Sequence, residues 1–433
     1  MITSVSGIRG ILNRDLSLVD CARFAGSFAR VAESPEILLA RDTRSTGPAI
    51  CRAVSGALLA RGKEVLDFGI VSTPALFRES LTRKRPAVMV TASHNEPEYN
   101  GLKFVMDGVG IGKDSFEIVV GAKPAEPEAY GQGSVKIAAR TRYVDDLVER
   151  FGEESCEGVK VALDLGGGAA ISHAVPLLRR LGCDVTSVND SYGVFNRTID
   201  PTADGLDLLR KMVKLKRCEI GLGFDCDGDR LVIVDDQGNR RTGDYMLTLA
   251  LAQILPQSKE RNLVVSVDTT QAVDLVAGAA GARVLRSKVG EANVVGMMAE
   301  NGARLGGEGS SGGLIDGSFN YCRDSMLAAV TIVGALKKKG ARVYREVESF
   351  QQHRVALRMP RSKAMRAIKA LAARNPSADT TDGVKVWISK RSWVLVRASG
   401  TEDLLRVSAE AETAGKAAQI VGAFSAMAKE LSR

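Results

Sequence analysis

Short apolar runs recur along the chain, and most are followed by small or polar residues and then by a stretch with helical spacing of its apolar positions. In the first third of the sequence, runs at 36–40, 65–68 and 88–90 alternate with a helical pattern over 50–61. Runs of this length predict buried strands, and strands that alternate with helices predict parallel βαβ units. The pattern therefore predicts an α/β fold with mixed, mainly parallel sheets.

The alternation of strands and helices restarts twice further along the chain. The first restart begins with an amphipathic helix, and the second ends with an apolar helix that we assign to the core. The predicted elements are helices over 143–151, 173–181 and 326–338, and strands over 159–163, 184–188, 219–224, 231–234, 263–267 and 283–285.

From about residue 351 the pattern changes to strands and helices of the α+β kind. A helix over 363–374 precedes a predicted hairpin, which is followed by a strand at 405–409 and a final helix. A chain of 433 residues is too long for one hydrophobic core, so several domains are expected. We predict three α/β domains and a C-terminal α+β domain. Their boundaries are 1–140, 141–240, 241–350 and 351–433.

Reactive side chains gather after the third predicted strand. Ser93 and His94 stand at its end, where open α/β sheets bind ligands. Lys103 returns to the same edge after two turn signals, Glu96-Pro97 and Asn100-Gly101. An ordinary polar loop is the alternative interpretation.

An arginine between glycines lies near the N-terminus, in the segment Ser6-Gly7-Ile8-Arg9-Gly10. This composition predicts a flexible loop that presents Arg9 to an anion. A surface arginine without a ligand is the alternative.

Three aspartates alternate along a tight loop between two apolar strands. Asp225, Asp227 and Asp229 surround Gly228, and carboxylates this close repel one another unless a cation lies between them. Oxygen ligands of this kind favour a hard cation, so the sequence predicts Mg²⁺ here. A solvated acidic turn is the alternative. An EF-hand is excluded, because its downstream glutamate and flanking helices are missing.

A glycine-rich segment follows the predicted strand at 304–305. Glu308 and Ser310 lie among its glycines, where a carboxylate and hydroxyls can bind a polyol while the backbone approaches closely. A flexible linker is the alternative.

The C-terminal segment carries an anion-binding pattern. Two arginines, two hydroxyls and the backbone amide at a glycine can form a compact phosphate-binding loop. Its residues are Arg397, Ser399, Gly400, Thr401 and Arg406. We predict that this domain acts as a lid that carries an anion clamp.

Composition narrows the classes of function. The net charge is +8, but the basic residues are dispersed and only 5% of residues are aromatic, which disfavours nucleic-acid binding. The seven cysteines form no CxxC pair, which fits a reducing compartment and argues against zinc. Neither a signal peptide nor a membrane span is indicated, so we expect a cytoplasmic protein.

These loops, in this order, resemble the α-D-phosphohexomutase family along essentially the whole chain. The reactive-loop pattern TASHNPxxYNGxK matches residues 91–103, with Glu96 where proline is common. The metal-loop pattern DxDGDR matches residues 225–230. The phosphate-loop pattern RxSGTEP matches residues 397–402, with Asp403 in place of proline.

The resemblance implies a heart-shaped, four-domain enzyme around a central cleft, which moves a phosphoryl group between the 1- and 6-positions of a hexose. It implies that Ser93 carries the phosphate, that Ser93 and the three aspartates hold Mg²⁺, and that a hexose 1,6-bisphosphate is the intermediate and activator. Lys103 is then the candidate general acid or base, through a lowered pKa, with Arg9 and His94 as alternatives. Arg230 would help to screen the phosphate.

The resemblance also assigns the substrate contacts. Lys288 would lie in the substrate region, Glu308 and Ser310 would bind the sugar, and the C-terminal loop would bind the phosphate that is not reacting. Gly312 stands where many bacterial members have a histidine, so no role of that histidine carries over. This glycine-rich form looks more like archaeal-type members.

The SGTE form of the phosphate loop favours phosphoglucosamine mutase activity. Phosphomannomutase/phosphoglucomutase activity is the close alternative, and a phosphatase or a non-catalytic sugar-phosphate binder is a weaker one. A hexose phosphate is the expected partner, without nucleic acid or membrane, for a monomer or homodimer.

Overall fold

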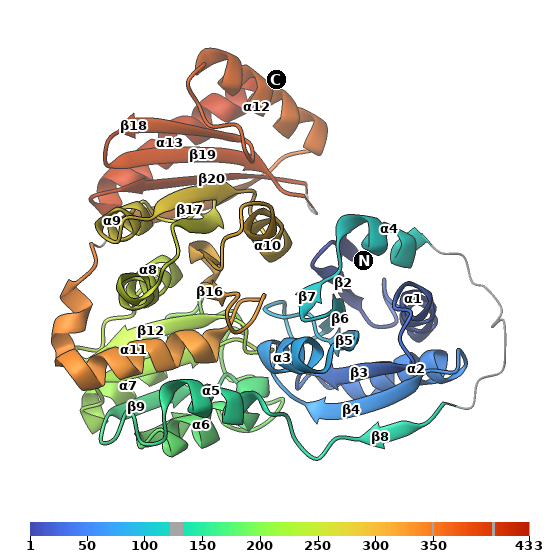
Figure 1. Cartoon of the computed structure of the whole chain (residues 1–433). Helices are drawn as coiled ribbons and strands as arrows, with labels where there is room; N and C mark the ends of the chain where they lie inside the picture. Colours follow the sequence, from blue (N-terminus) through green and yellow to red (C-terminus); the bar gives the residue numbers. More distant parts are fainter. Residues whose placement is uncertain (122–132, 349, 401–402, 433) are drawn as a thin grey trace.

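The computed structural model describes residues 1–121, 133–348, 350–400 and 403–432. Four β-sheets, each with packed helices, follow one another along the chain and lie in an arc (Figure 1). The predicted α/β architecture with a C-terminal α+β domain is confirmed. The predicted domain boundaries fall between these sheets, and their exact positions stay predictions.

The N-terminal domain is built on the largest sheet. Its strand order is β1-β2-β6-β5-β3-β4-β8, and β7 pairs with β6. Strands β5, β3, β4 and β8 run parallel, whereas β6 runs antiparallel to both β5 and β2. Its elements are β1 (Ile2–Ser4), β2 (Gly7–Ile11), α1 (Leu18–Val31), β3 (Glu36–Arg41), α2 (Gly47–Leu59), β4 (Glu64–Ile70), α3 (Thr73–Arg83), β5 (Ala87–Val90), β6 (Tyr99–Met106), β7 (Val109–Gly110), α4 (Lys113–Gly121) and β8 (Val135–Ile137).

The second and third domains repeat one plan, with three parallel strands and an antiparallel strand at one edge. Their strand orders are β10-β9-β11-β12 and β14-β13-β15-β16. The elements are α5 (Tyr143–Phe151), β9 (Lys160–Asp164), α6 (Ala174–Arg180), β10 (Asp184–Val188), α7 (Asp207–Lys216), β11 (Ile220–Phe224), β12 (Leu231–Asp235), α8 (Gly243–Ile254), β13 (Asn262–Ser266), α9 (Ala272–Ala279), β14 (Arg283–Ser287), α10 (Glu291–Glu300), β15 (Leu305–Glu308), β16 (Gly313–Asp316) and α11 (Ser325–Lys339).

The C-terminal domain is an antiparallel sheet with two helices. Its strand order is β17-β20-β19-β18. The elements are β17 (Gln351–Arg358), α12 (Arg361–Arg374), β18 (Val384–Ser389), β19 (Ser392–Ala398), β20 (Leu404–Ala411) and α13 (Ala414–Leu431). The domain packs on the third domain, where Lys385 Nζ donates to the carbonyl of Val267 at 2.7 Å and the buried Trp393 contacts the same residue.

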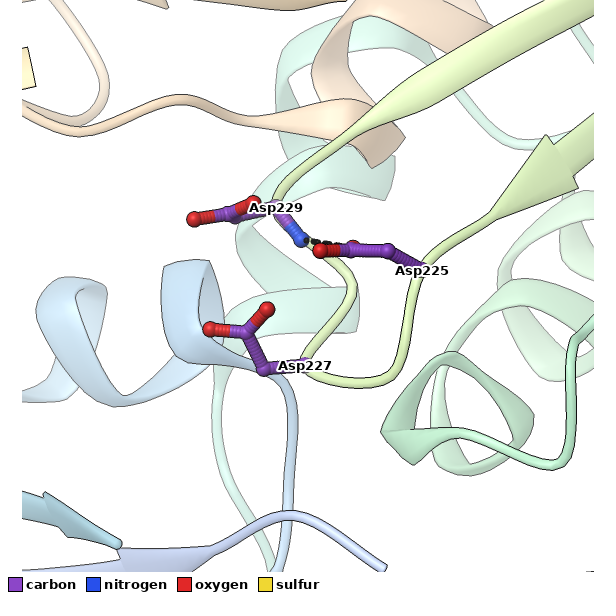
Figure 2. A group of neighbouring side chains, drawn as sticks. All are labelled: Asp225, Asp227 and Asp229. Atoms are coloured by element: carbon purple, nitrogen blue, oxygen red, sulfur yellow. Dashed lines mark hydrogen bonds between the residues drawn. The ribbon is translucent and has the colours of Figure 1, made fainter. Parts of the chain in front are cut away.

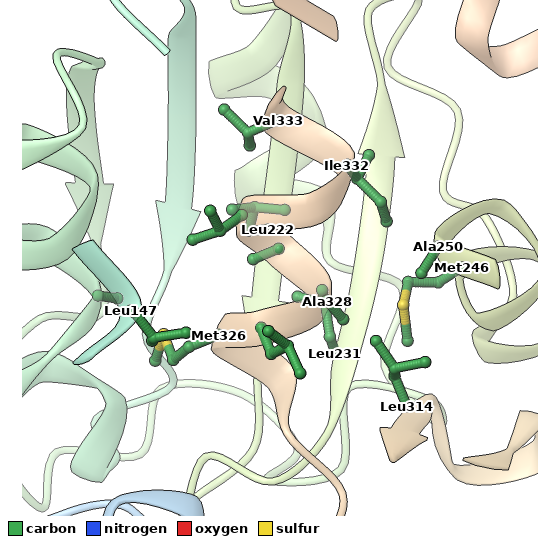
Figure 3. Packing of buried hydrophobic residues seen from close by; sticks show 14 of the residues in the cluster. Leu147, Leu222, Leu231, Met246, Ala250, Leu314, Met326, Ala328, Ile332 and Val333 are labelled. Carbon is green, nitrogen blue, oxygen red and sulfur yellow. The ribbon is translucent and has the colours of Figure 1, made fainter. Parts of the chain in front are cut away.

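Helix α11 connects the second and third domains through one continuous core. Met326, Ala328, Ile332 and Val333 lie on α11 and pack among side chains from β11, β12, α8 and β16 (Figure 3). Buried apolar area of this extent is the main favourable term in folding. The two domains are therefore expected to keep a fixed relative orientation.

Several helices begin at side-chain caps that the local sequence supplies. Ser17 and Asp20 form a reciprocal capping box at the start of α1. Asp324 caps α11 by accepting from the backbone N–H of Leu327 at 3.0 Å. Among the described helices, none has the length and apolar character needed to cross a bilayer.

Two expectations for the N-terminal domain were wrong, and three of its helices were not predicted. Arg9 lies in strand β2 instead of a flexible loop, and the predicted turn at Asn100-Gly101 lies inside strand β6. Strands β2 and β6 pair closely at this point: a Cβ on Gly101 would lie 1.9 Å from the carbonyl oxygen of Ile8. The glycine therefore marks a close strand contact. The unpredicted helices are α1, α3 and α4.

We expect Gly101→Ala to destabilise the N-terminal domain by about 3 kcal/mol, because its methyl group would push β2 away from β6. Gly110→Ala is the matched control in the same sheet, since a Cβ there meets no atom within 4 Å. The measurement is thermal unfolding followed by calorimetry. Equal unfolding midpoints for the two variants would contradict the strand pairing described here.

Candidate active site

Ser93 lies in a strained turn directly after strand β5. Its φ is 53°, in the left-handed region that non-glycine residues seldom occupy. Its backbone N–H donates to Thr91 Oγ1 at 2.8 Å, and the residue is fully buried. Strain of this kind persists only where the surroundings hold it, and it is common at functional sites.

A buried arginine holds this turn. Arg44 Nη2 donates to the carbonyl oxygens of Ser93 at 2.7 Å and Asn95 at 2.6 Å, and its side chain has no exposed surface. Asp42 accepts from Arg44 Nε at 3.1 Å and from Thr91 Oγ1 at 2.6 Å. No role for Arg44 was predicted from the sequence. One signal was available. Arg44 follows the predicted strand at 36–40, and the ends of neighbouring parallel strands such as β3 and β5 lie at the same edge of the sheet.

Arg44 also reaches the far end of the same loop. Its Nη1 donates to the carbonyl oxygen of Tyr99 at 2.8 Å and to that of Glu96. One guanidinium therefore binds four carbonyl groups of the segment between β5 and β6. A planar group with several donors suits this task better than an ammonium.

The three predicted aspartates converge at the end of strand β11 (Figure 2). One carboxylate oxygen from each of Asp225, Asp227 and Asp229 lies within 4.8 Å of the others, and all three side chains are buried. Asp225 Oδ1 accepts from the backbone N–H groups of Asp229 at 3.1 Å and Arg230 at 3.2 Å. Gly228 allows the tight turn with a φ of 68°.

The free oxygen atoms of this cluster fit a metal ion. Within the described part of the chain, Oδ1 of Asp227 and Oδ1 of Asp229 are buried and have no hydrogen-bond partner. Burial and the charges of the other two carboxylates raise the pKa of Asp225 well above its usual value. Such crowding is relieved by a hard cation with oxygen ligands. The aspartate cluster can therefore hold a metal.

The structure brings Ser93 and Lys103 to this cluster from the N-terminal domain. Ser93 Oγ lies 3.4 Å from Asp225 Oδ2. Lys103 Nζ donates to Asp227 Oδ2 at 2.8 Å and lies 3.3 Å from Asp229 Oδ2. Thr73, which the sequence analysis did not identify, donates to Asp227 Oδ2 at 2.6 Å from the start of α3.

The expected lowering of the pKa of Lys103 is wrong for this arrangement. Burial disfavours the ammonium, but the carboxylates of Asp227 and Asp229 outweigh it and raise the pKa of Lys103 above its usual value. The sequence suggested cationic neighbours, whereas the closest neighbours are anions. Lys103 is therefore a fixed positive charge.

Further basic residues lie beside Ser93. Arg9 Nη1 donates to Asn95 Oδ1 at 2.9 Å, and Arg230 Nη1 donates to Asp200 Oδ2 at 2.8 Å. His94 lies between Ser93 and Arg230, with Nδ1 3.3 Å from Ser93 Oγ and Nε2 3.4 Å from Arg230 Nη2. Burial and the positive charges of Arg230 and Arg9 lower the pKa of His94 well below its usual value, so the imidazole is neutral near pH 7. Burial also lowers the pKa of Arg9, to about 10.

The predicted sugar loop starts inside strand β15. Glu308 is the last residue of that strand, not the first after it, and is buried. Its Oε1 accepts from the backbone N–H of Gly290 at 2.6 Å, in the loop that also contains the exposed Lys288. Ser310 lies in the following 3₁₀ turn and hydrogen-bonds to Asp268.

Gly312 has a structural reason to be glycine. Its φ is 66°, and a Cβ would lie 2.3 Å from the carbonyl oxygen of Leu231. A histidine at this position would be strained and would clash with strand β12. The packing of the third domain on the second therefore requires glycine at the position where many bacterial members have a histidine.

The predicted phosphate-binding residues form a second cluster, in the C-terminal domain. Arg397 and Arg406 face each other across strands β19 and β20, and Ser399 is buried at the end of β19. The carbonyl oxygen of Gly400 accepts from Arg361 Nη1 at 3.2 Å. Thr401 lies outside the described residues. That this cluster binds the phosphate that is not reacting at Ser93 stays a prediction.

Four family descriptions match the chain in order. The phosphoglucomutase/phosphomannomutase alpha/beta/alpha domains I, II and III match residues 1–124, 141–238 and 242–353. The C-terminal domain of the same family matches residues 355–427.

Individual relatives agree with these matches. The phosphoglucosamine mutase of Geobacillus kaustophilus is 31% identical, over 94% of this chain and 93% of its own length. A phosphoglucomutase/phosphomannomutase of Thermococcus kodakarensis is also 31% identical, over 95% and 94%. The crystal structure of a phosphoglucomutase/phosphomannomutase family protein from Burkholderia thailandensis aligns with a TM-score of 0.84 at 26% identity, over 99% of this chain and 98% of that one. With all four domains matched in order and relatives of this identity along nearly the full length, the chain belongs to the phosphoglucomutase/phosphomannomutase family of phosphohexomutase enzymes.

Proposed function

We propose that this enzyme is a phosphoglucosamine mutase, which interconverts glucosamine 6-phosphate and glucosamine 1-phosphate through a phosphorylated Ser93. The observation that carries the proposal is the buried Ser93 Oγ, 3.4 Å from Asp225 in a cluster of three carboxylates. A serine in this setting is placed to carry a phosphoryl group rather than to act as a surface hydroxyl. The full-length relative of that name in Geobacillus kaustophilus supports the choice of sugar.

The residues present fit Mg²⁺, which Asp225, Asp227, Asp229 and the phosphorylated Ser93 would hold. When bound, the ion neutralises negative charge on the phosphoryl group. Phosphoryl transfer depends mainly on positioning and charge neutralisation. Lys103, which contacts the aspartate cluster, and Arg9, which contacts Asn95 on the Ser93 loop, contribute positive charges.

The reaction consists of two transfers, and each moves a different phosphoryl group. In the first, the bond between Ser93 Oγ and phosphorus breaks while a sugar hydroxyl oxygen bonds to phosphorus, which yields a hexose 1,6-bisphosphate. In the second, Ser93 Oγ bonds to the other phosphorus of the turned intermediate while the bond from that phosphorus to the sugar oxygen breaks, and this oxygen takes up the proton that was removed in the first step. The sugar hydroxyl loses a proton in the first step, and we assign its acceptance to His94, which is neutral and near Ser93 Oγ. Lys103 is a poor base because its pKa is raised.

Glu308 and Ser310 would bind sugar hydroxyls in this scheme, with Lys288 nearby in the loop after β14. Arg397, Ser399, Gly400, Thr401 and Arg406 would bind the phosphate that is not reacting. A clamp in a separate domain suits a bound intermediate that has to turn around before the second transfer.

Phosphoglucomutase/phosphomannomutase activity is the second candidate. The Thermococcus kodakarensis relative of that name is as similar as the phosphoglucosamine mutase relative. A site that accepts two orientations of one bisphosphate can also tolerate different groups on the sugar.

We also infer that the enzyme acts in the cytoplasm as a monomer or homodimer, on a small substrate without nucleic acid or a membrane. All seven cysteines are buried free thiols, which suits a reducing compartment. Hexose phosphates are charged metabolites that do not cross membranes unaided.

Arg44 acts as a positioning residue in this proposal, because its N–H groups donate hydrogen bonds to carbonyl oxygens of the loop that carries Ser93. The left-handed backbone of Ser93 depends on these bonds. A shift of the serine by about 1 Å can lower a rate roughly a hundred-fold.

With Mg²⁺ and a catalytic amount of the matching 1,6-bisphosphate, we expect conversion of glucosamine 6-phosphate to be faster than that of mannose 6-phosphate or glucose 6-phosphate. Phosphorus NMR follows all three reactions side by side. Faster conversion of mannose or glucose phosphate would support the second candidate. Release of inorganic phosphate in excess of isomer would indicate a phosphatase.

Ser93→Ala should lower isomerisation by roughly a thousand-fold or more, because the covalent intermediate cannot form. Mass spectrometry should find phosphate on Ser93 in the native enzyme only. Ser27→Ala is the control: it removes another buried serine hydroxyl from the same domain, on α1. Full activity of Ser93→Ala would refute the assignment of the phosphate carrier.

Arg44→Lys should lower kcat about a hundred-fold and leave the KM for the sugar phosphate within about three-fold of the native value. The variant keeps the charge but cannot bind four carbonyl groups in one plane. Guanidinium ions should partly restore the activity of Arg44→Ala, which leaves a space of matching shape. Arg83→Lys is the control: this exposed arginine pairs with the buried Glu79 on the same helix, α3. Native kcat in Arg44→Lys would show that the loop holds Ser93 without this arginine.

A further inference from the structure

Arg323 is a buried charge that bridges two loops of the site. It lies between strand β16 and helix α11, and its side chain is 8% exposed. Its Nη2 donates to Asp229 Oδ2 at 2.7 Å, and its Nη1 donates to Glu308 Oε2 at 3.1 Å. Its Nε lies 3.2 Å from Glu291 Oε2, which completes a set of three carboxylates around one guanidinium.

The backbone leaves space for this side chain at one residue. A Cβ on Gly313 would lie 2.3 Å from Cδ and 2.4 Å from Cγ of Arg323. The aliphatic part of the arginine therefore occupies the volume that any other residue at position 313 would fill. Gly313 therefore leaves the space that the Arg323 side chain needs, which indicates that the guanidinium has one defined position.

Two of the carboxylates that Arg323 contacts, those of Asp229 and Glu308, leave their second oxygen outside this contact. Asp229 Oδ2 is shared by Arg323 and Lys103, while Asp229 Oδ1 has no hydrogen-bond partner among the described residues. Glu308 Oε1 is taken by the backbone N–H of Gly290. The arginine thus determines which oxygen of Asp229 is free and which way the Glu308 carboxylate faces.

The two carboxylates belong to different domains. Asp229 follows β11 of the second domain in the metal loop, and Glu308 ends β15 of the third domain in the sugar loop. A planar fork with fixed donor directions sets both the distance and the angle between its two partners. A lysine at position 323 would supply charge without this geometry.

We propose that Arg323 is a positioning residue that holds the metal loop and the sugar loop in register and thereby sets which hexose the enzyme prefers. The part that concerns the sugar rests on the proposed function of Glu308. The part that concerns the metal loop depends only on the contact with Asp229.

The first test is a double-mutant cycle of Arg323→Met and Glu308→Gln, with kcat/KM measured for the three hexose 6-phosphates. We expect each single variant to lose about a hundred-fold for the preferred sugar and to reduce its preference over the others. We expect the double variant to lose about as much as one single variant, because both changes break the same contact. A ten-thousand-fold loss in the double variant would overturn the proposal.

A general loss of stability is distinguished by a matched control. Arg150 also bridges the second and third domains, through Asp316 at 2.6 Å, outside the site. Arg150→Met should leave the sugar preference unchanged. Arg323→Lys should keep the fold but show the same loss of preference as Arg323→Met, and a native preference in Arg323→Lys would also overturn the proposal.

The second test measures Mn²⁺ binding by electron paramagnetic resonance, without substrate. A guanidinium on Asp229 opposes a second cation there, so Arg323→Met should bind Mn²⁺ at least about ten-fold more tightly than the native enzyme. Arg323→Lys and Arg150→Met should stay within about three-fold of native. Unchanged or weaker binding in Arg323→Met would contradict the contact with Asp229.

The two tests separate this inference from the proposed function. If the native enzyme converts none of the three sugars, the proposed function fails, and Mn²⁺ binding alone decides whether Arg323 contacts the metal loop through Asp229. If the native enzyme is active and the two variants act additively, the proposed function stands and the inference fails.

Discussion

Repulsion among three buried aspartates governs the arrangement around Ser93. Asp225, Asp227 and Asp229 lie too close together to be stable as bare anions in a buried site. The cations that offset them come from other domains: Lys103 from the N-terminal domain and Arg323 from the third. Because each partner is buried, removal of any one leaves an uncompensated charge. The site therefore exists only when three domains are assembled.

The apolar core makes that assembly stable. Helix α11 packs its buried face across the sheets of the second and third domains, and the same cluster extends to residues of the N-terminal domain such as Phe77 and Met89. Charges contribute little net stability when they are removed from water. We infer that the core holds the domains together and that the charged network is accommodated within this frame to serve the reaction.

The C-terminal domain is attached differently. Its own core is a separate cluster, and a small contact around Val267, Trp393 and Leu395 joins it to the third domain. Ion pairs such as Arg354 with Asp244 and hydrogen bonds such as that of Gln271 N–H to Glu410 add to this contact. A mostly polar attachment suits a domain that has to move when a substrate enters or turns. The lid closure that we predicted from the sequence would bring this domain onto the site formed by the other three.

The alternation of apolar runs and helical stretches was sufficient to predict the α/β domains and the C-terminal α+β domain. Ser93, Lys103 and the three aspartates were also identified from sequence, because each lies at or near a strand end, and strand ends in parallel sheets converge. The positions of Arg9 and Gly101 were misjudged. Glycine suggests a loop or turn locally, and only the close approach of β2 to β6 shows that it permits strand pairing.

The sequence by itself thus determined the fold class, the reactive loop and the carboxylate cluster, since these depend on local periodicity and on residue types at short spacing. The tertiary structure decided the roles of Arg44 and Arg323 and the sign of the pKa shift of Lys103. Each of these depends on contacts between residues far apart in the chain. An arginine looks the same in the sequence whether it faces water or three carboxylates, and only the packing of the domains decides between them.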